Sequence, residues 1–472
     1  MPRPPSLPAP PPRNTPLFIA LADDIERQIR DGAYKPGDKL PSLRELVRQR
    51  ALGKNTVVTA FELLVARGLV EPKRGAGYFV KARAEAPQRS DDDAGSLGRA
   101  MDIVWLMRTQ LHIEPGQLAV GDAFPPAEWL SGARLDRIHH KVARGGLGTL
   151  FRYGDRRGYA PLRQRLVRKI GDLGIGAEPR QILLTHGANE AMDLIVRYFV
   201  PPGAAVLIDD PGYYPLFGKL RLAGANIIGV PRLPDGPDIE ALERLLITWR
   251  PRLYFTQSFG HNPTGSDLSL PKARRVLQLA ERHDLRIVEN DALADFKAPT
   301  LARLSALDQL ERTLYIGSFS KTLSAALRVG FVACSPDLAS DLADLKILVS
   351  VSSSEYCERT VDTLLGERNY PRHLERLRQR VTDATAKARA LFHSLGAEIF
   401  AEEPAESMFL WARFPDAPDS LEMARTLMAE NIVMAPGRIF RVDGSAVSPW
   451  ARYNVHAVLD ARFGRALGRG VG

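Results

Sequence analysis

The sequence predicts an α/β protein in which a small helical head precedes a large domain built on a mainly parallel sheet. Two observations carry this prediction. Residues 15–80 hold three short helical patterns followed by two strand-like runs around the glycine-rich segment 73–77. From residue 101 onward, short apolar runs such as 205–208 and 313–316 alternate with amphipathic stretches. Such alternation is typical of parallel strands that are covered by helices on both faces.

The composition is that of an ordinary globular protein with several domains. The chain has 472 residues, of which 45% are hydrophobic and 25% charged, and its net charge of +9 is modest for this length. Cys334 and Cys357 give neither a disulfide framework nor a metal-ligand spacing, so we expect no metal. No apolar run reaches the roughly 18 residues that a membrane helix needs. We therefore expect a cytoplasmic protein without a membrane partner.

Two segments have compositions that argue against packed structure. Residues 1–14 are rich in proline and lack the apolar stretch of a secretory signal, so we expect a disordered arm. Residues 81–100 are polar and acidic, contain glycine and serine, and show no hydrophobic periodicity, which is typical of a flexible tether. The predicted organisation is thus an arm, a head over 15–80, a linker and a large domain over 101–472.

The head has the local features of a winged helix-turn-helix. An apolar series over residues 17–29 has helical spacing, and Ser42 with Glu45 forms a capping box in front of a second helix. A third helix is expected from about residue 55 to 67. The glycines of residues 73–77 then permit a sharp hairpin with a basic tip.

Cationic residues are spread over this head in a way that suits DNA. Arg44, Lys54 and Arg74 fall on the second helix, the start of the third helix and the wing, so they can meet phosphates while the third helix reaches base edges. The head resembles that of GntR-type regulators, and the resemblance implies DNA contacts by Arg44, Lys54, Asn55, Thr56, Arg74 and Gly75. Lys54 stands where that family often has arginine, which keeps the charge but loses the bidentate fork.

Five motifs follow predicted strands of the large domain, at the edge where ligands collect in this architecture. Residues 185–190 open a helix whose free N–H groups could hold a phosphate, and Tyr213 could stack on a ring. Asn262 offers a hydrogen-bond donor, and residues 289–291 form a polar cluster. Lys321 follows the last of these strands. Each motif alone is common in loops, but the five in this order indicate a binding site for pyridoxal 5'-phosphate.

The expected chemistry of this site depends on Lys321. A lysine at the end of a buried strand is desolvated, which lowers its pKa and favours imine formation with an aldehyde. Arg328 lies two helical turns further along the sequence and could bind the same phosphate as residues 185–190.

From about residue 100 to the C-terminus the chain resembles fold type I pyridoxal phosphate enzymes of the aspartate aminotransferase class. Together with its head it resembles the MocR subgroup of GntR regulators. The resemblance implies an aminotransferase-like domain with a small C-terminal α+β subdomain, and a homodimer. It implies that Lys321 carries the internal aldimine, that Asn262 meets the ring hydroxyl and that Tyr213 stacks on the ring. The phosphate would bind Ala188, Asn189, Ser318 and Arg328, with Tyr153 from a neighbouring subunit, and Arg452 would bind the carboxylate of an effector.

One motif departs from the family pattern. Family members usually place an aspartate against the ring nitrogen, in a Glu-Asp-Asp motif that a tyrosine follows. Here Asn290 stands in that register, and Asp291 faces the other way unless the strand slips by one residue. A neutral amide weakens the electron sink that stabilises a carbanion, and Leu293 supplies no phenol. Both changes favour binding over efficient transamination.

The sequence therefore predicts a DNA-binding transcriptional regulator that carries pyridoxal phosphate and senses an amine or amino acid. An active aminotransferase with a fused DNA-binding head is the alternative. A third possibility, in which the large domain is a ligand-free dimerisation scaffold, conflicts with the complete set of lysine and phosphate motifs.

Overall fold

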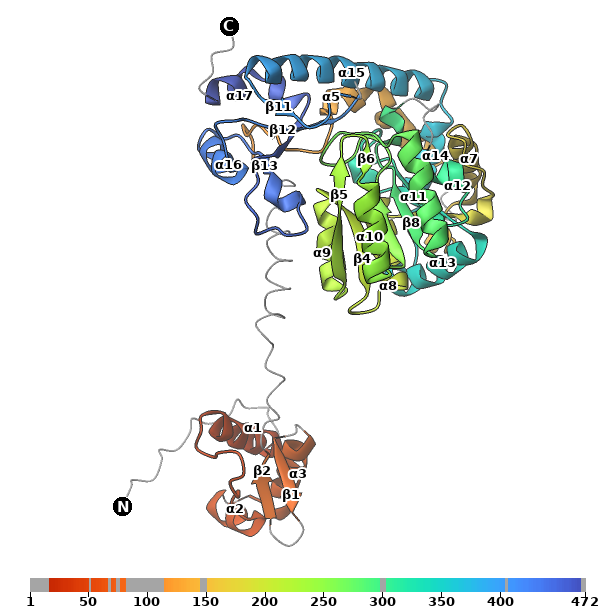
Figure 1. Ribbon diagram of the computed structural model, residues 1–472. Helices are drawn as coiled ribbons and strands as arrows, with labels where there is room; N and C mark the ends of the chain where they lie inside the picture. The colour runs from red at the N-terminus through yellow and green to blue at the C-terminus, as the bar shows by residue number, and fades with distance from the viewer. Residues whose placement is uncertain are drawn as a thin grey trace. The chain divides into compact units, whose positions relative to one another are not determined.

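The computed structural model describes two compact units, Met1–Ala94 and Gly95–Gly472 (Figure 1). The predicted arm over residues 1–14 and all of the predicted linker beyond residue 81 fall outside the described residues. The description covers residues 17–50, 52–66, 69–73, 77–81, 114–144, 151–297, 303–403 and 406–467.

The first unit has the helical and strand elements of a winged helix-turn-helix. Its elements are α1 (Leu17–Arg30), α2 (Leu43–Arg50), α3 (Lys54–Ala66), β1 (Val70–Lys73) and β2 (Gly77–Val80). The two strands pair antiparallel, with Val70 opposite Val80. The hydroxyl of Ser42 accepts a hydrogen bond from the Glu45 amide at 3.2 Å, which caps α2 as predicted. Phe61 of α3 is fully buried in the small core that these elements share.

The second unit is built on a mainly parallel sheet, as predicted, although some of its strand pairs are antiparallel. Its strand order is β3-β10-β9-β8-β7-β4-β5-β6, in which β4, β5, β7, β8 and β9 are parallel while β10 runs antiparallel to β3 and β9. The strands are β3 (Ile182–Thr185), β4 (Ala205–Asp210), β5 (Asn226–Leu233), β6 (Gly236–Pro237), β7 (Leu253–Thr256), β8 (Arg286–Asn290), β9 (Thr313–Ser318) and β10 (Gly330–Ala333).

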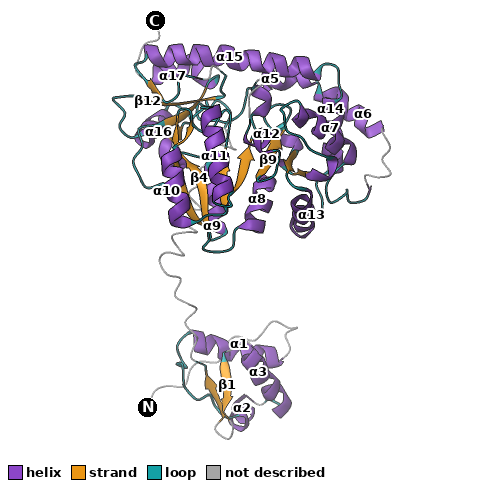
Figure 2. Ribbon diagram, turned by 45° about the vertical axis from the view of Figure 1, so that its right-hand side comes forward, coloured by secondary structure: helices purple, strands orange, loops and turns teal. Residues whose placement is uncertain are grey.

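Helices cover both faces of this sheet (Figure 2). Successive strand residues pack into different clusters, because side chains alternate along a strand. Leu207 and Tyr254 pack with α10 (Ile239–Trp249) and α11 (Leu270–Arg282). Ile208 and Phe255 pack on the other face with α8 (Gly187–Phe199), α9 (Tyr214–Leu222) and α13 (Pro336–Ser350). Burial on both faces explains why these strands are apolar throughout rather than alternating.

Further helices surround the sheet or lead out of it. They are α5 (Ala127–Leu130), α6 (Leu135–Arg144), α7 (Ala160–Gly171), α12 (Leu304–Asp308), α14 (Glu355–Leu365), α15 (Tyr370–Ser394), α16 (Ser420–Ala429) and α17 (Ala461–Ala466). The long helix α15 leads to a second, antiparallel sheet of order β11-β12-β14-β13, which is the predicted C-terminal α+β part. Its strands are β11 (Glu398–Ile399), β12 (Phe409–Arg413), β13 (Ala435–Pro436) and β14 (Ala451–Asn454).

A segment that precedes α5 is held by this C-terminal part. Leu118 donates its amide hydrogen to the Asn431 carbonyl at 2.9 Å, and Gly121 donates to the Val433 carbonyl at 3.0 Å. A Cβ on Gly121 would lie 2.3 Å from the Ala435 nitrogen, so only glycine permits this close approach. The pairing fixes the residues that follow Gly121, three of which line the candidate site.

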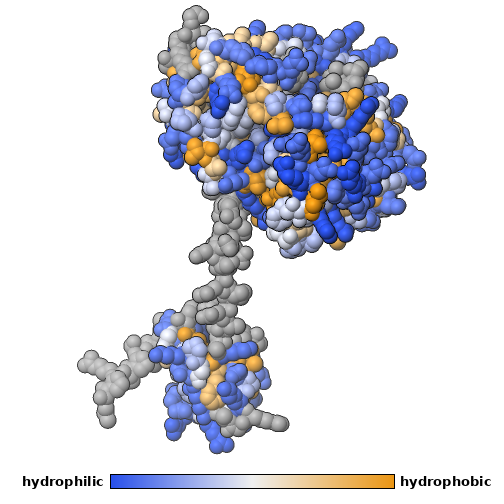
Figure 3. Space-filling view, in the orientation of Figure 1, coloured by the Kyte–Doolittle hydropathy of each residue, from blue (hydrophilic) through white to orange (hydrophobic). Residues whose placement is uncertain are grey.

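The face of each unit seen in Figure 3 is largely hydrophilic, with scattered apolar residues. No helix in the described ranges combines the length and the apolar character that crossing a membrane requires. The same residues contain no group of three or more histidine, cysteine, aspartate or glutamate side chains arranged to hold a metal ion.

Candidate functional site

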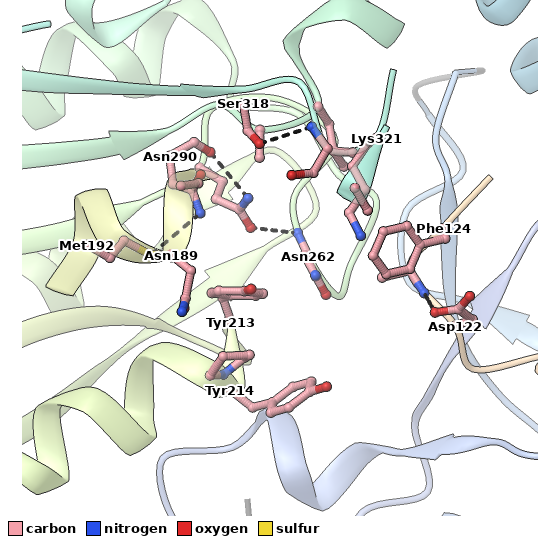
Figure 4. A pocket seen from close by; sticks show the side chains of 18 of the residues that line it. Asp122, Phe124, Asn189, Met192, Tyr213, Tyr214, Asn262, Asn290, Ser318 and Lys321 are labelled. Carbon is pink, nitrogen blue, oxygen red and sulfur yellow. Dashed lines mark hydrogen bonds between the residues drawn. The ribbon is translucent and has the colours of Figure 1, made fainter. Parts of the chain in front are cut away.

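A cavity of about 600 Å³ lies where the parallel strands end and the C-terminal part begins. Its walls come from the start of α8, the loops after β4 and β7, the ends of β8 and β9, and strands β12 and β14. The structure brings most of the predicted ligand-binding residues together in this cavity: Ala188, Asn189, Tyr213, Asn262, Asn290, Ser318, Lys321, Arg328 and Arg452. Figure 4 shows how the labelled side chains converge.

The Lys321 side chain reaches into the cavity just beyond the end of β9. Desolvation lowers the pKa of its amine to about 7, an effect that Arg452 and Arg328 reinforce and that Asp122 opposes. At neutral pH roughly half of such an amine is uncharged, and only the uncharged form attacks an aldehyde. Its nitrogen lies 3.0 Å from the centre of the Phe124 ring.

The start of α8 and Arg328 form a cradle for an anion. Gly187 begins the helix with a φ of 71°, and no side chain caps the first turn. Arg328 donates a hydrogen bond to the His186 carbonyl at 3.0 Å. A Cβ on Gly187 would lie 2.9 Å from the Arg328 guanidinium, so glycine permits the cation to approach. Amide groups of a helix N-terminus beside an arginine suit a phosphate.

Arg452 and Asn262, which also line the cavity, are joined by a hydrogen bond. The Nη1 atom of Arg452 donates to the Oδ1 atom of Asn262 at 2.9 Å, and its Nη2 atom donates to the Gly121 carbonyl at 2.6 Å. Arg452 is almost fully buried, and its guanidinium lies about 5 Å from the rings of Phe409 and Phe440. A buried, oriented guanidinium in a cavity wall can bind a carboxylate.

Asn290 and Asp291 lie on opposite sides of the end of β8. Asn290 lines the cavity, with its Nδ2 atom 3.9 Å from the Met192 sulfur. Its Oδ1 atom is buried and has no hydrogen-bond partner in the described part of the chain. Asp291 does not line the cavity: it forms a buried ion pair with Arg303 and accepts a hydrogen bond from the Tyr315 hydroxyl at 3.1 Å. The asparagine therefore faces the cavity, and the aspartate does not.

Several cavity residues were not predicted from the sequence. The Gln257 side chain accepts a hydrogen bond from the backbone N–H of Asn262 at 2.9 Å and donates one to the backbone carbonyl of Asn290 at 3.2 Å. It therefore connects both asparagines. It directly follows β7, and the rule that ligands collect at strand ends could have found it. Asp122 and Phe124 come from the segment that is paired with the C-terminal part, and no local pattern marks them.

Tyr153 lies apart from the cavity of its own chain. Its side chain is 83% exposed and does not line the cavity. Its assignment to the phosphate of a neighbouring subunit stays a prediction.

The predicted DNA-contact residues lie around the start of α3, as far as the structure describes them. Arg44 on α2 is exposed, as are Lys54 and Asn55 at the start of α3, whereas Thr56 is half-buried. α2 packs against α3. Arg74 and Gly75 lie outside the described residues. The exposed cations are therefore available to phosphates.

Two family profiles match the chain. Residues 20–80 match the bacterial regulatory proteins of the gntR family, and residues 125–466 match aminotransferase class I and II. The two matches fall on the head and on the domain that contains the cavity.

The similar proteins include regulators and an enzyme. The regulator YdcR of Escherichia coli, which is described as uncharacterized, is 27% identical over 92% of this chain and 93% of its own length. The probable rhizopine catabolism regulatory protein MocR of Rhizobium meliloti is 26% identical over 90% and 87%. The 2-aminoadipate transaminase of Thermus thermophilus is 32% identical over 76% and 92%.

Among solved structures, LysN, the α-aminoadipate aminotransferase of Thermus thermophilus complexed with N-(5'-phosphopyridoxyl)-L-leucine, is similar to the second unit. The TM-score is 0.71 at 27% identity, covering 80% of this chain and 98% of that one.

Proposed function

Because this chain belongs to the aminotransferase class I and II family and carries a GntR-family head, as the MocR-type regulators do, we propose that it is a transcriptional regulator that binds pyridoxal phosphate on Lys321 and senses an amine or amino acid. The observation that carries the proposal is the convergence of Lys321, the Arg328 cradle and Arg452 in one cavity. DNA binding by the head would then respond to what this cavity holds.

The cavity residues fit pyridoxal phosphate. The phosphate would bind Ala188, Asn189, Ser318 and Arg328, and Tyr213 would contact the face of the ring. Among the described residues the buried Oδ1 atom of Asn290 has no hydrogen-bond partner, which indicates that a polar group of a ligand belongs beside this side chain. The Asn290 amide can donate through its Nδ2 atom to an unprotonated ring nitrogen when the side chain is turned over. When bound, the cofactor supplies an aldehyde that condenses with amines. Lys321 and an effector amine would compete for that aldehyde, while Arg452 would bind the effector carboxylate.

One experiment tests the whole proposal. A DNA duplex selected from a random pool by the purified protein serves as the probe, and amines are titrated while the visible spectrum and the duplex affinity are recorded together. We expect the amines that change the spectrum to change the duplex affinity over the same concentration range. A protein that takes up no added pyridoxal phosphate, or spectral changes that leave DNA affinity constant, would overturn the proposal.

The head should bind DNA through exposed cations. We expect Arg44→Ala and Lys54→Ala each to weaken binding to the selected duplex by about tenfold at about 0.1 M salt, and to lower the slope of log affinity against log salt by about 1, because each removes a phosphate contact. Fluorescence anisotropy measures both quantities. Arg27→Ala, which removes an exposed cation from α1, is the control and should change little. Unchanged affinity in both test variants would contradict the docking through α2 and α3.

An exposed apolar patch, made of Phe151, Leu348 and Val351, supports the proposed homodimer. Phe151 and Leu348 are each 84% exposed, and Val351 is also exposed. The two segments that carry these side chains approach each other near Gly154, where an added Cβ would lie 3.7 Å from the Ser353 carbonyl oxygen. Such a patch indicates a protein partner, and its position beside the exposed Tyr153 fits a second copy that receives this tyrosine.

The double variant Phe151→Asp/Leu348→Asp tests this interface. Two carboxylates in an apolar contact should raise the dimer dissociation constant by at least about 30-fold, which corresponds to ~2 kcal/mol. Analytical ultracentrifugation measures the change. Ile247→Asp on α10 places the same charge on a residue that is 63% exposed and lies outside the patch, and it should leave the dimer intact. A wild-type protein that is monomeric at micromolar concentration would exclude the dimer.

An active aminotransferase is the second candidate function. Its support is the 32% identity to a relative named 2-aminoadipate transaminase. Asn290 argues against efficient turnover, because an amide in that position cannot hold a ring nitrogen protonated as a carboxylate does. Rapid turnover of an amino donor with a keto acid by the wild-type protein would favour the enzyme.

A further inference from the structure

Among the described residues that line the cavity, one is acidic, and this residue is Asp122. Its position is fixed on both sides by the C-terminal part: Gly121 donates to the Val433 carbonyl at 3.0 Å, and Asn454 donates to the Asp122 carbonyl at 3.3 Å. In Figure 4 the Phe124 ring lies between the Lys321 amine and the Asp122 carboxylate. The carboxylate is therefore a fixed feature of the wall rather than part of a loose loop.

The Asp122 carboxylate interacts with cations of the cavity only at a distance. It accepts a hydrogen bond from the Ala123 amide at 2.6 Å. Lys321 and Arg452 act on it electrostatically and lower its pKa, but burial outweighs them and raises the pKa overall. Asp122 forms no ion pair with any residue in the described part of the chain. A half-buried carboxylate without a cation in contact can bind one from a ligand.

The proposed function already employs each cation of the wall. Arg328 would bind the phosphate and Arg452 the effector carboxylate. Lys321 holds the aldehyde before the effector arrives, and after its release the Phe124 ring still separates its amine from Asp122. With these partners in place, the Asp122 charge stays uncompensated unless the effector itself brings a second positive group. The apolar side chains of Phe124, Tyr214 and Phe409 line the same cavity and suit a methylene chain.

On the basis of that function, we propose that the effector is a diamino monocarboxylic acid, whose carboxylate binds Arg452 and whose second ammonium group binds Asp122. The amine that condenses with the cofactor and the ammonium at Asp122 are then at different ends of one ligand. A linear chain of methylene groups joins them and passes the aromatic side chains of the wall.

Pairs of amino acids that differ only by the second ammonium group test the assignment. The cofactor-loaded wild-type protein is titrated with L-lysine and L-ornithine, and with norleucine and norvaline, which lack the second ammonium group. Dissociation constants come from the visible spectrum. We expect at least one diamino acid to bind about tenfold to a hundredfold more tightly than its apolar counterpart, as is typical of a hydrogen-bonded charge. In Asp122→Asn this preference should fall to about one, because the diamino acids lose the partner of their second ammonium group.

Asp136→Asn is the matched control, because it makes the same change at an exposed site on α6 and should preserve the preference. If Asp122→Asn weakens lysine and norleucine alike, or if the wild-type protein has no preference, the inference is wrong although the sensor function stands. If no amine of any kind changes the spectrum, the proposed function itself fails.

A second variant keeps the test decisive if Asp122→Asn does not retain the cofactor. Asp122→Glu keeps the charge and extends it by one methylene group toward the ligand. The preference should then move from the longer diamino acid toward the shorter one. An unchanged order of lysine and ornithine in Asp122→Glu would overturn the assignment.

Discussion

Replacing Lys321 with alanine should abolish the visible absorption band of protein-bound pyridoxal phosphate. The Lys321 amine lines the cavity, and burial lowers its pKa to about 7, so it is the amine prepared to react with the aldehyde. Alanine offers no nitrogen, and no other lysine lines the cavity among the described residues. Absorbance spectra after incubation with the cofactor and dialysis measure the effect, which we expect to be a complete loss.

A surface lysine provides the control for this loss. Lys141, whose side chain is 66% exposed, forms an ion pair with Glu367, and Lys141→Ala should keep the full band. Chemical reduction of the wild-type complex should fix the cofactor on the peptide that contains residue 321, as mass spectrometry can show. A band that persists unchanged in Lys321→Ala would refute the assignment of this lysine.

Replacing Asn290 with aspartate should turn a weak catalyst into a better one. A carboxylate at this cavity position would hold the ring nitrogen protonated and so strengthen the electron sink. We expect transamination turnover to rise by at least about tenfold, which corresponds to ~1.4 kcal/mol of barrier. The rise should appear in single-turnover measurements with an amino donor, where product release does not limit the rate.

Asn290→Ala distinguishes the effect of adding a carboxylate from the effect of removing the amide. It removes the amide without adding a carboxylate, so it should give no increase in turnover. Equal turnover of Asn290→Asp and the wild-type protein would show that Asn290 is not what limits the chemistry. Asp291 cannot substitute in this test, because its ion pair with Arg303 holds it away from the cavity.

Local patterns were enough to predict most of the elements that build the site. The helices of the head were predicted from helical spacing and a capping box, and strands β3, β4, β7, β8 and β9 from short apolar runs. Each of these signals lies within a few consecutive residues. β5 and β10 were not predicted. β5 contains Gly229 and Pro231, which interrupt a strand pattern, and β10 has only four residues and begins with Gly330.

Most of the predicted site residues follow strands, whereas Asp122 and Phe124, which do not follow strands, were missed. Lys321, Asn262 and Asn290 follow or end strands, so their motifs and their common location could be predicted together. Asp122 reaches the cavity only because the chain around Gly121 pairs with residues near 433. A contact across that sequence separation depends on the folded C-terminal part and leaves no local signal.

The hydrogen bond from Arg452 to Asn262 would make the visible spectrum of a bound cofactor sensitive to anions. It joins a strand of the C-terminal part to the loop beside the main sheet, at a distance of 2.9 Å. An anion that docks on Arg452 would draw the guanidinium away from the Asn262 oxygen, and hydrogen-bonded chains polarise one another. The side-chain amide of Asn262, which we expect to donate to the ring hydroxyl of the cofactor, would then donate less strongly. An anion bound to Arg452 would thus shift the absorbance of the cofactor before any amine has reacted.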